Sequence, residues 1–284
     1  MSERPRDKPV PRETAELSSI DRAAVGFFRP YAKLTLGFFA GIGKRAYFMK
    51  DTLRAFGEVG TWWPEAFKHM RSIGVDSVPL TCLVAAFIGS VIALQTRYQL
   101  FPGIQLSVVG FISRQMITLE MAPLITALVL AGRVGARITA EIGTMRVTEQ
   151  IDALETLAFD PVAYLVVPRI IAGLLMLPVL SILANAIGLV SAWATASMAT
   201  DVTSDQFREG LRLGFTYFQV VYSVLKAFLF GGAISFLCSY EGYVTDAGAE
   251  GVGRATAKAV VFGCVAVLIL DALTAVLLAP YLQS

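Results

Sequence analysis

The side chains with the greatest capacity for chemistry lie between two long apolar runs, in the stretch from Ala131 to Pro161. Its charged residues are Arg133, Arg137, Glu141, Arg146, Glu149, Asp152, Glu155 and Asp160. Catalysis would need a nucleophile beside a base, or a metal cluster. The chain has one histidine, His69, and its three cysteines are scattered through apolar runs. These charges therefore favour ion pairing or the binding of a partner over an enzyme active site.

The first half of this stretch has the spacing of a tightly packed helix. Small residues recur around Gly135 at intervals of three and four, which lets helices approach closely in lipid. Arg133, Arg137 and Glu141 are four residues apart, so they share one face and can pair along the helix. We expect a packing role for these four residues.

The second half predicts a short amphipathic helix that begins at a Thr148 N-cap and is stopped by Pro161. Ile151, Leu154 and Ala158 would form its apolar stripe, while Glu149, Asp152 and Glu155 would form an acidic one. A solvated loop would not need the apolar stripe, and anionic headgroups would repel the acidic one. The pattern favours a surface for a protein partner over an intramolecular lid.

The composition places these charges in an integral membrane protein. The chain has 284 residues, of which 55% are hydrophobic and 16% charged, against about 25% charged in soluble domains. Five windows are long enough to span a bilayer: Val78–Leu100, Leu106–Ala131, Tyr164–Met198, Tyr217–Tyr240 and Ala259–Leu282. The net charge of +2 gives no support for nucleic-acid binding. We therefore expect an all-α integral membrane protein with five transmembrane helices.

The chain divides by composition into three expected regions. Residues 1–22 read as a disordered tail, 23–74 as interfacial amphipathic helices rich in aromatic and basic residues, and 75–284 as the five-span domain. Thirteen Lys and Arg residues precede Asp76, and few lie in the loop after the first span or in the last six residues. The positive-inside rule then predicts a cytoplasmic N-terminus and a cytoplasmic loop between spans two and three.

Ionisable residues inside the apolar windows are costly, so each is a candidate for function or for pairing. Arg114 and Glu120 lie in the second window, Lys226 in the fourth and Asp271 in the fifth, and Arg97 lies near the end of the first. Glu120 either faces a hydrated cavity or is a structural partner of Arg114 or Lys226. Lys226 and Asp271 can form an ion pair between spans four and five.

One segment is specific enough to suggest a family. The sequence "LEMAPLITALVLAGRVGARITAEIGTMRVTEQIDALETLAFDPVAYLVVPRIIAG" resembles the signature of the MlaE/YrbE permeases, and the likeness runs from about Thr61 to the C-terminus. These are membrane subunits of ABC transporters that move phospholipids or related lipids between membranes. The resemblance implies a coupling helix that sits in a groove of the ATPase, formed here by Glu149, Gln150, Ile151, Asp152, Leu154 and Glu155.

The resemblance also implies partners and a location. It implies a homodimer in the bacterial inner membrane, two copies of an ABC ATPase, an MCE-domain protein on the outer side and, in some members, a STAS-domain subunit. The nearest approach to a phosphate-binding loop, "GFFAGIGKRAY", has the wrong spacing and lacks Ser or Thr after the lysine. We therefore expect no cofactor in this chain, with ATP and Mg²⁺ bound by the partner.

The family's lipid cavity is expected near Glu120. Relatives often have Arg-Glu-Leu-Gly-Pro where this chain has Leu119-Glu120-Met121-Ala122-Pro123, so the acid matches and the arginine does not. We take Arg97, Arg114 and Glu120 as lipid-path candidates. An ion-coupled secondary transporter of amphiphiles, with Glu120 or Asp271 as its proton site, is the alternative function. The sequence determines neither the lipid nor the direction of transport.

Overall fold

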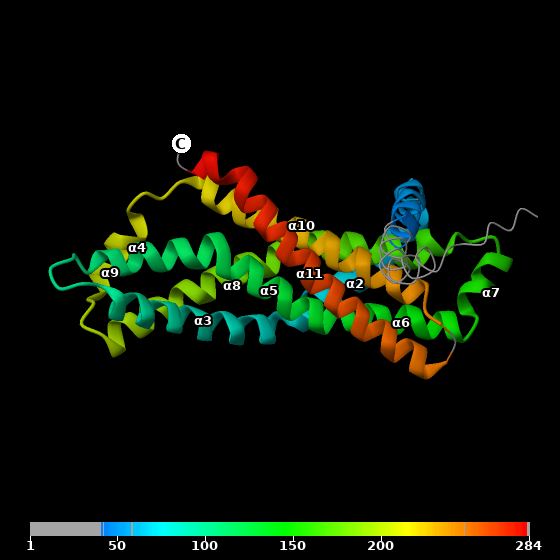
Figure 1. The fold of residues 1–284 in the computed structure, drawn as a ribbon, viewed down its shortest axis with the longest axis horizontal. Coiled ribbons are helices and arrows are strands. Elements are labelled where there is room, and N and C mark those ends of the chain that lie inside the picture. Colours follow the sequence, from blue (N-terminus) through cyan, green and yellow to red (C-terminus); the bar gives the residue numbers. More distant parts are fainter. Residues whose placement is uncertain (1–40, 42, 58, 247, 283–284) are drawn as a thin grey trace, which may run out of the picture. The chain divides into compact units, whose positions relative to one another are not determined.

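A computed structural model describes residue 41 and residues 43–57, 59–246 and 248–282 (Figure 1). The chain divides into two compact units, Met1–Met49 and Lys50–Ser284, and helices α2 to α11 lie in the second. The expected tail over residues 1–22, and the amphipathic segment as far as residue 40, lie outside the described residues. Every regular element among the described residues is a helix, which confirms the all-α class.

Five segments within the described residues are long and apolar enough to cross a membrane, as expected. They are Trp62–Gln99, Ser107–Val147, Val162–Ala199, Tyr217–Tyr243 and Ala249–Leu278. The first begins at Trp62 rather than Val78, and the second continues to Val147 rather than ending at Ala131. Both differences have one cause, because the helices continue beyond the strictly apolar windows into segments that also carry charge.

The first three spans are built from several helical pieces. The first contains α2 (Val59–Ile73), the 3₁₀ turn η1 (Val75–Ser77) and α3 (Val78–Gln99). The second contains α4 (Ser107–Gln115), α5 (Ala122–Leu130) and α6 (Ala136–Val147), joined by the π turns η2 (Met116–Met121) and η3 (Ala131–Gly135). The third contains the π turn η4 (Val162–Val166) and α8 (Val167–Ala199).

The remaining elements are α7 (Gln150–Thr156), α9 (Ser204–Arg212), α10 (Tyr217–Tyr243) and α11 (Ala249–Leu282). Helix α9 begins with a capping box, in which the Thr203 N–H donates to Gln206 Oε1 at 3.0 Å. Helices α7 and α9 lie at opposite ends of the second unit (Figure 1). The spans between them therefore separate one polar end from the other.

Small residues hold α3 and α8 close together. A Cβ added at Gly89 would lie 2.0 Å from the carbonyl oxygen of Gly188, so the two backbones are in direct contact. Ser90 and Ser191 share a hydrogen bond of 2.7 Å, and Thr195 donates to Ser90 at 2.9 Å. This is the packing that helices use in lipid, where close approach and interhelical hydrogen bonds replace the hydrophobic driving force.

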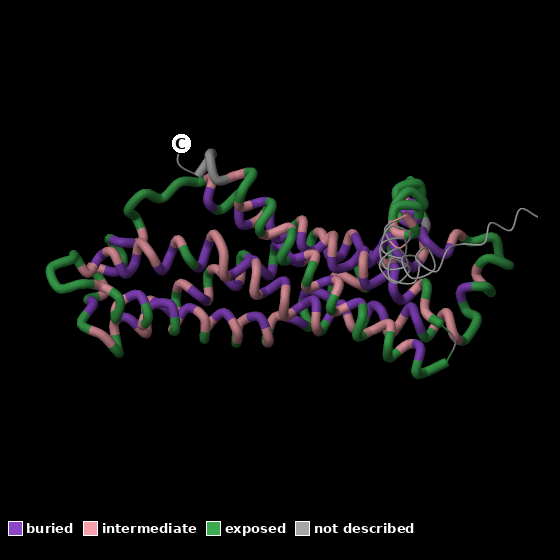
Figure 2. Tube along the Cα trace, viewed as in Figure 1, coloured by how far each residue is buried: buried purple, intermediate pink, exposed green. Residues whose placement is uncertain are grey.

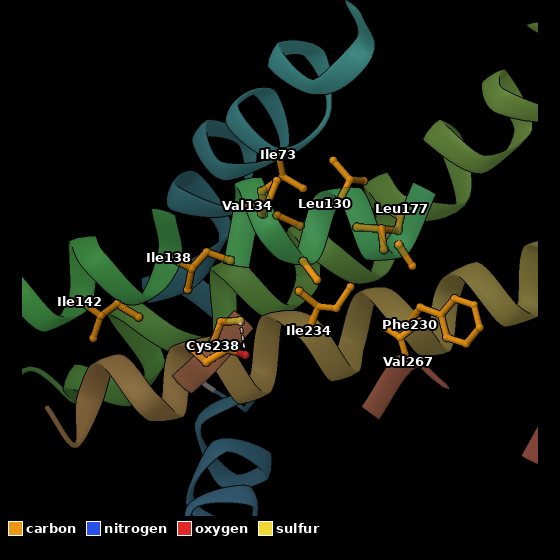
Figure 3. Close-up of a cluster of buried hydrophobic side chains, with 14 of the residues drawn as sticks. Ile73, Leu130, Val134, Ile138, Ile142, Leu177, Phe230, Ile234, Cys238 and Val267 are labelled. Atoms are coloured by element: carbon orange, nitrogen blue, oxygen red, sulfur yellow. Dashed lines mark hydrogen bonds between the residues drawn. The ribbon is translucent and has the colours of Figure 1, made fainter. Parts of the chain in front are cut away.

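The second contact of this kind joins α8 to α10. A Cβ added at Gly231 would lie 2.3 Å from the Gly173 carbonyl oxygen, and Asn185 donates to Ser223 at 3.1 Å. Apolar side chains from several spans meet beside this crossing (Figure 3): Leu130, Val134, Ile138 and Ile142 from the second, Leu177 from α8, Phe230, Ile234 and Cys238 from α10, and Val267 from α11. Helix α10 thus lies at the centre of the packing.

The outer faces of the spans are apolar and exposed, as expected for contact with lipid or with another copy of the chain. On α3, Leu83, Phe87 and Val91 follow one another at intervals of four and are all more than half exposed. Exposed and buried residues alternate along each helix in Figure 2. On α11 the exposed apolar set is Val261, Val265, Leu268, Ile269, Leu273, Val276 and Leu277. A soluble domain would bury such rows.

Candidate functional site

The short helix α7 presents an acidic face and buries an apolar one. Ile151 is fully buried, and Leu154 packs against the core beside it. Glu149, Asp152 and Glu155 are all exposed. The helix is tied back to α6 by Arg146, which donates to Asp152 Oδ1 at 2.7 Å. The structure therefore brings the six residues predicted for coupling into one element, at the end of the unit opposite α9.

The ends of α7 differ from the sequence prediction. The N-cap is Glu149 rather than Thr148, and Glu149 has the left-handed backbone φ of 59°. Thr148 instead donates its hydroxyl back to the Thr144 carbonyl at 2.8 Å, as β-hydroxyl residues do in the last turn of a helix. The left-handed conformation of Glu149 separates α6 from α7, and the chain changes direction there.

The prediction of where this helix ends was also wrong. Helix α7 stops at Thr156, and Ala158 is exposed with a left-handed φ of 60°, so Ala158 is not part of the apolar stripe. Pro161 is the N-cap of η4 and so begins the next span instead of stopping α7. Asp160 accepts the Val162 N–H at 2.8 Å and supports that start. Proline suits the start of a helix because its missing N–H has no partner there anyway.

An apolar groove runs beside α7. It has a volume of about 340 Å³ between α6, α7 and η4 and is lined by Met145, Gln150, Ala153, Leu154, Leu157, Tyr164 and Leu165. Leu157 is 68% exposed and Phe159 is 52% exposed. The acidic face of α7 and this groove together form a surface with charged and apolar parts, which is the chemistry of a protein interface.

The packing candidates of the second span have separate partners. Arg137 donates to Glu141 Oε1 at 2.8 Å, and Glu141 also accepts from the buried Arg169 at 3.2 Å. Arg133 does not join this row: it donates to Ser77 Oγ at 2.7 Å, at the break between α2 and α3. Gly135 lies against α10, where an added Cβ would be 2.7 Å from Cys238 Sγ.

Three ionisable side chains from three spans meet around Lys226. The Lys226 side chain is fully buried, with Nζ 2.7 Å from Glu120 Oε2 and 2.6 Å from Asp271 Oδ1. It also donates to the Leu119 carbonyl at 3.3 Å, and its ammonium lies 5.1 Å from the centre of the Tyr222 ring. Glu120 thus pairs with Lys226, which is one of the two sequence alternatives, and its side chain is 39% exposed.

Arg114 lies apart from this cluster and is 4% exposed. Its guanidinium donates to the Gln219 side chain and, at 2.7 Å, to the Leu213 carbonyl. The central carbon of the Arg114 guanidinium lies 5.5 Å from the centre of the Phe215 ring. Gln219 was missed in the sequence, although Gln219, Ser223 and Lys226 recur at four and three residues along one face of α10. That polar periodicity was the available signal.

Arg97 is in the last turn of α3, at the end of the unit where α9 lies. Its Nε and Nη2 donate to the two carboxylate oxygens of Asp201 at 2.5 and 2.6 Å, which is a bidentate pair. This hydrogen bonding lowers the pKa of Asp201 below its usual value. The pair joins the end of α3 to the end of α8. The three lipid-path candidates, Arg97, Arg114 and Glu120, therefore occupy separate places, and none contacts another directly.

Two grooves lie along α3 on the side of the second span. One is a narrow apolar crevice of about 10 Å³ with walls from α3, η2, α5 and α8, including Ile88, Ile117 and Met121. The other, of about 370 Å³, lies nearer the α9 end, where Gln95 and Gln99 add polar groups to the apolar Met116. A path for an amphiphile needs such apolar walls with a few polar groups. No group of three His, Cys, Asp or Glu among the described residues could hold a metal ion.

The fold and these surfaces define a multi-pass α-helical membrane protein with ion pairs inside its spans and an amphipathic helix between the second and third. The chain belongs to the MlaE permease family, whose model, described as "Permease MlaE", matches residues 66–277. The match includes all five spans for most of their length and the whole of α7.

Curated relatives cover most of the chain. It is 35% identical over 240 residues to a probable ABC transporter permease protein of Rickettsia bellii, covering 84% of this chain and 92% of the relative. It is 32% identical over 251 residues to the intermembrane phospholipid transport system permease protein MlaE of Haemophilus influenzae, covering 87% and 95%. The chloroplastic protein TRIGALACTOSYLDIACYLGLYCEROL 1 of Arabidopsis thaliana is 31% identical over 210 residues, covering 74% and 60%.

Proposed function

We propose that this chain is the permease subunit of an ABC transporter that moves phospholipids or related lipids between membranes. Its family membership and the names of its relatives support the transporter class and the lipid substrate. The observation that carries the proposal is α7, a short helix anchored through the buried Ile151 that exposes acidic side chains. A membrane subunit without a phosphate-binding loop needs such a surface to receive force from a separate ATPase.

In this proposal α7 is the coupling helix and faces the cytoplasm. The N-terminus is then also cytoplasmic, the membrane is the bacterial inner membrane, and α9 lies on the outer side. The working assembly is a homodimer with two ATPase copies, which bind the ATP and Mg²⁺, and an MCE-domain protein outside. In some relatives a STAS-domain subunit would join it. The exposed apolar rows of α3 and α11 supply surface for lipid and for the second copy.

The lipid path in this proposal follows the grooves along α3. Their apolar walls suit acyl chains, and the partly exposed Glu120 offers a polar group near them. Arg114 is less suited to contact lipid than the sequence predicted, because it is buried and two of its nitrogens already donate to Gln219 and Leu213. We therefore keep Glu120 as the leading lipid-path residue and assign Arg114 to packing.

The coupling role is tested by reversing charge on α7. Glu155→Lys changes an exposed residue on the acidic face and should leave folding intact, because exposed substitutions change stability little. We expect the ATPase to be lost on co-purification, or its hydrolysis to be uncoupled from lipid transfer in proteoliposomes. Glu250→Lys is the matched control, since Glu250 is also exposed, on the first turn of α11. Normal ATPase recovery and transfer in Glu155→Lys would contradict the proposal.

The topology is tested by cysteine labelling on a cysteine-free background. A cysteine at Glu155 on α7 should resist impermeant thiol reagents in intact cells, whereas one at Ser204 on α9 should react once any outer barrier is permeabilised. The two positions suit the test because α7 and α9 lie at opposite ends of the unit. The reverse pattern would invert the orientation.

The Lys226 cluster favours one alternative, an ion-coupled transporter, because buried ionisable groups also serve as proton sites. The two mechanisms differ in their energy source. Transfer of fluorescent phospholipid that needs ATP and survives collapse of the proton gradient supports the ABC mechanism. Transfer that persists without ATP and stops on collapse of the gradient supports the alternative.

A further inference from the structure

Helices α4 and α9 cross in direct contact at one end of the second unit, where Figure 1 shows them side by side. A Cβ added at Gly110 would collide with the Phe207 carbonyl oxygen, and one added at Gly210 would collide with the Ser107 carbonyl oxygen. No side chain therefore separates the two backbones at the crossing. The two helices together are called the α4–α9 cap below.

Arg114 fastens the same two helices one turn further along α4. It donates to the carbonyl oxygen of Leu213, the C-cap residue of α9, at 2.7 Å. Its guanidinium also lies 5.7 Å from the centre of the Phe111 ring and 5.5 Å from that of Phe215. Because Arg114 is 4% exposed, water hardly competes for these contacts. Packing and hydrogen bonding thus make the α4–α9 cap one body.

The chain enters and leaves this cap through irregular backbone. Helix α4 follows the exposed residues 101–105, where Gly103 has a φ of 96°, and it ends at the π turn η2. Helix α9 follows the non-helical residues 200–203 and precedes residues 213–216, where Gly214 has a φ of 57°. Hinges in proteins are loop or element-terminal residues that absorb changes in φ and ψ. All four connections of the cap are of this kind.

The cap also supplies a wall of the larger groove along α3. Gln95 and Gln99 line this groove from α3, whereas Ile112 lines it from α4 and Met116 from η2. Its volume of about 370 Å³ is at the lower end of the range for sites that hold small molecules. A phospholipid with two acyl chains is larger than this, so the groove has to widen before such a lipid can pass. Movement of α4 away from α3 would widen it.

One ion pair joins α3 to the start of the cap. Arg97 in the last turn of α3 donates to both carboxylate oxygens of Asp201, at 2.5 and 2.6 Å, and Asp201 lies between α8 and α9. The bidentate geometry makes the contact specific. The two side chains are nevertheless 27% and 59% exposed, and an ion pair open to water contributes little to stability. The pair can therefore open without unfolding the chain.

We propose that the α4–α9 cap is a gate over the groove between α3 and α4, and that the Arg97–Asp201 pair is the latch that holds the gate closed. When the pair opens, the cap turns about η2 and the non-helical connections, and the groove widens to admit or release an acyl chain. Arg114 makes α9 follow α4 in this movement. The nature of the cargo, and the placement of the gate on the outer side of the membrane, rest on the proposed function; the opening itself does not.

The first test measures access to the groove in the full chain in mild detergent. Thr96 lines the groove and is 7% exposed, so a cysteine at Thr96 on a cysteine-free background reacts with a maleimide only when the groove opens. Asp201→Asn should raise the rate of this reaction about threefold to fivefold, the change in an equilibrium expected from losing one exposed ion pair. A cysteine at Tyr98, which is 79% exposed, should react at the same rate in both proteins.

Two further variants separate the latch from a general loosening of the chain. Glu250→Gln removes a different exposed ion pair, with Arg254 on α11, and should leave the reaction at Thr96 unchanged. Exchange of the latch charges, Arg97→Asp with Asp201→Arg, should restore the slow reaction. The latch is overturned if Asp201→Asn reacts at the wild-type rate, or if Glu250→Gln accelerates the reaction as much.

The second test relates the gate to transport. Cysteines that replace Arg97 and Asp201 are joined by a short, cleavable thiol cross-linker, and ATP-driven phospholipid transfer is measured in proteoliposomes with the ATPase. Transfer should stop when the two positions are joined and return when the linker is cleaved. Normal transfer with the linker in place would overturn the gate while leaving the proposed function intact. Absence of transfer in the wild type would instead count against the proposed function, and the reaction at Thr96 would still report the gate.

Discussion

Lys226→Met is the substitution whose effect the structure defines best. Methionine has nearly the length of lysine but no charge, so the change removes the cation and leaves the packing. Lys226 is fully buried between Glu120 and Asp271, at 2.7 and 2.6 Å. Its loss would place two carboxylates near each other with no counterion. Removing one partner of a buried pair costs about 3–5 kcal/mol, and the exposure of Glu120 sets the estimate at the low end, about 3 kcal/mol.

The acid partners should behave differently, because each can be removed without isolating the lysine. After Glu120→Gln, Lys226 still pairs with Asp271, whose side chain is 17% exposed. The cluster is then formally neutral, and we expect a loss of about 1 kcal/mol or less, the value of an exposed pair. Glu120→Ala should therefore also reach normal membrane levels. In both variants the Asp271 carboxylate still pairs with Lys226, so no unpaired cation is left in the span.

Each detergent-solubilised variant is heated and then run on size-exclusion chromatography. The quantity measured is the temperature at which the peak of folded protein is lost. Lys226→Met should show the largest fall. The double variant Lys226→Met with Asp271→Asn should recover part of the loss, because one of the stranded charges is gone. The reasoning is refuted if Lys226→Met is as stable as the wild type, or if Glu120→Gln is equally damaging. Lipid transfer by a stable Glu120→Gln protein then reports the role of Glu120 separately from folding.

Two further predictions concern the packing of α3 on α8 and the pair of Arg97 with Asp201. Gly89→Ala should lower the yield of folded protein, because its Cβ would lie 2.0 Å from the Gly188 carbonyl oxygen and overpacking costs about 1–3 kcal/mol. Gly132→Ala, with nothing within 4 Å of the new Cβ, should be neutral in the same thermal assay. Hydrogen bonding from Arg97 lowers the pKa of Asp201, so the pair stabilises the fold above the ordinary aspartate pKa and loses this effect as pH falls through the lowered value. In Arg97→Gln, the unfolding temperature should no longer show this fall at acidic pH. If its dependence on pH is the same as in the wild type, the pair does not contribute to stability.

The number and order of the spans could be predicted from the sequence because each needs about twenty apolar residues, a signal that requires no partner. The pairing of polar residues across spans could be predicted only where few partners existed, as for Lys226 with Asp271. Arg97 had no evident partner in the sequence, because Asp201 lies beyond the end of the third span and is brought near only by the packing of α3 on α8. The start of α7 was placed one residue early, because the left-handed turn at Glu149 has no glycine to mark it.

The π turn at Met116–Met121 changes the direction in which the following residues of the span face around the helix axis. An α-helix turns by about 100° per residue, and a π turn accommodates one residue more than the α-helix would. If the same residues formed a regular α-helix instead, the rest of the span would turn by about that angle. Gly135 would then no longer face Cys238, and the row of Arg137 and Glu141 would leave Arg169. The conformation of this one turn therefore decides which neighbours the far end of the span faces.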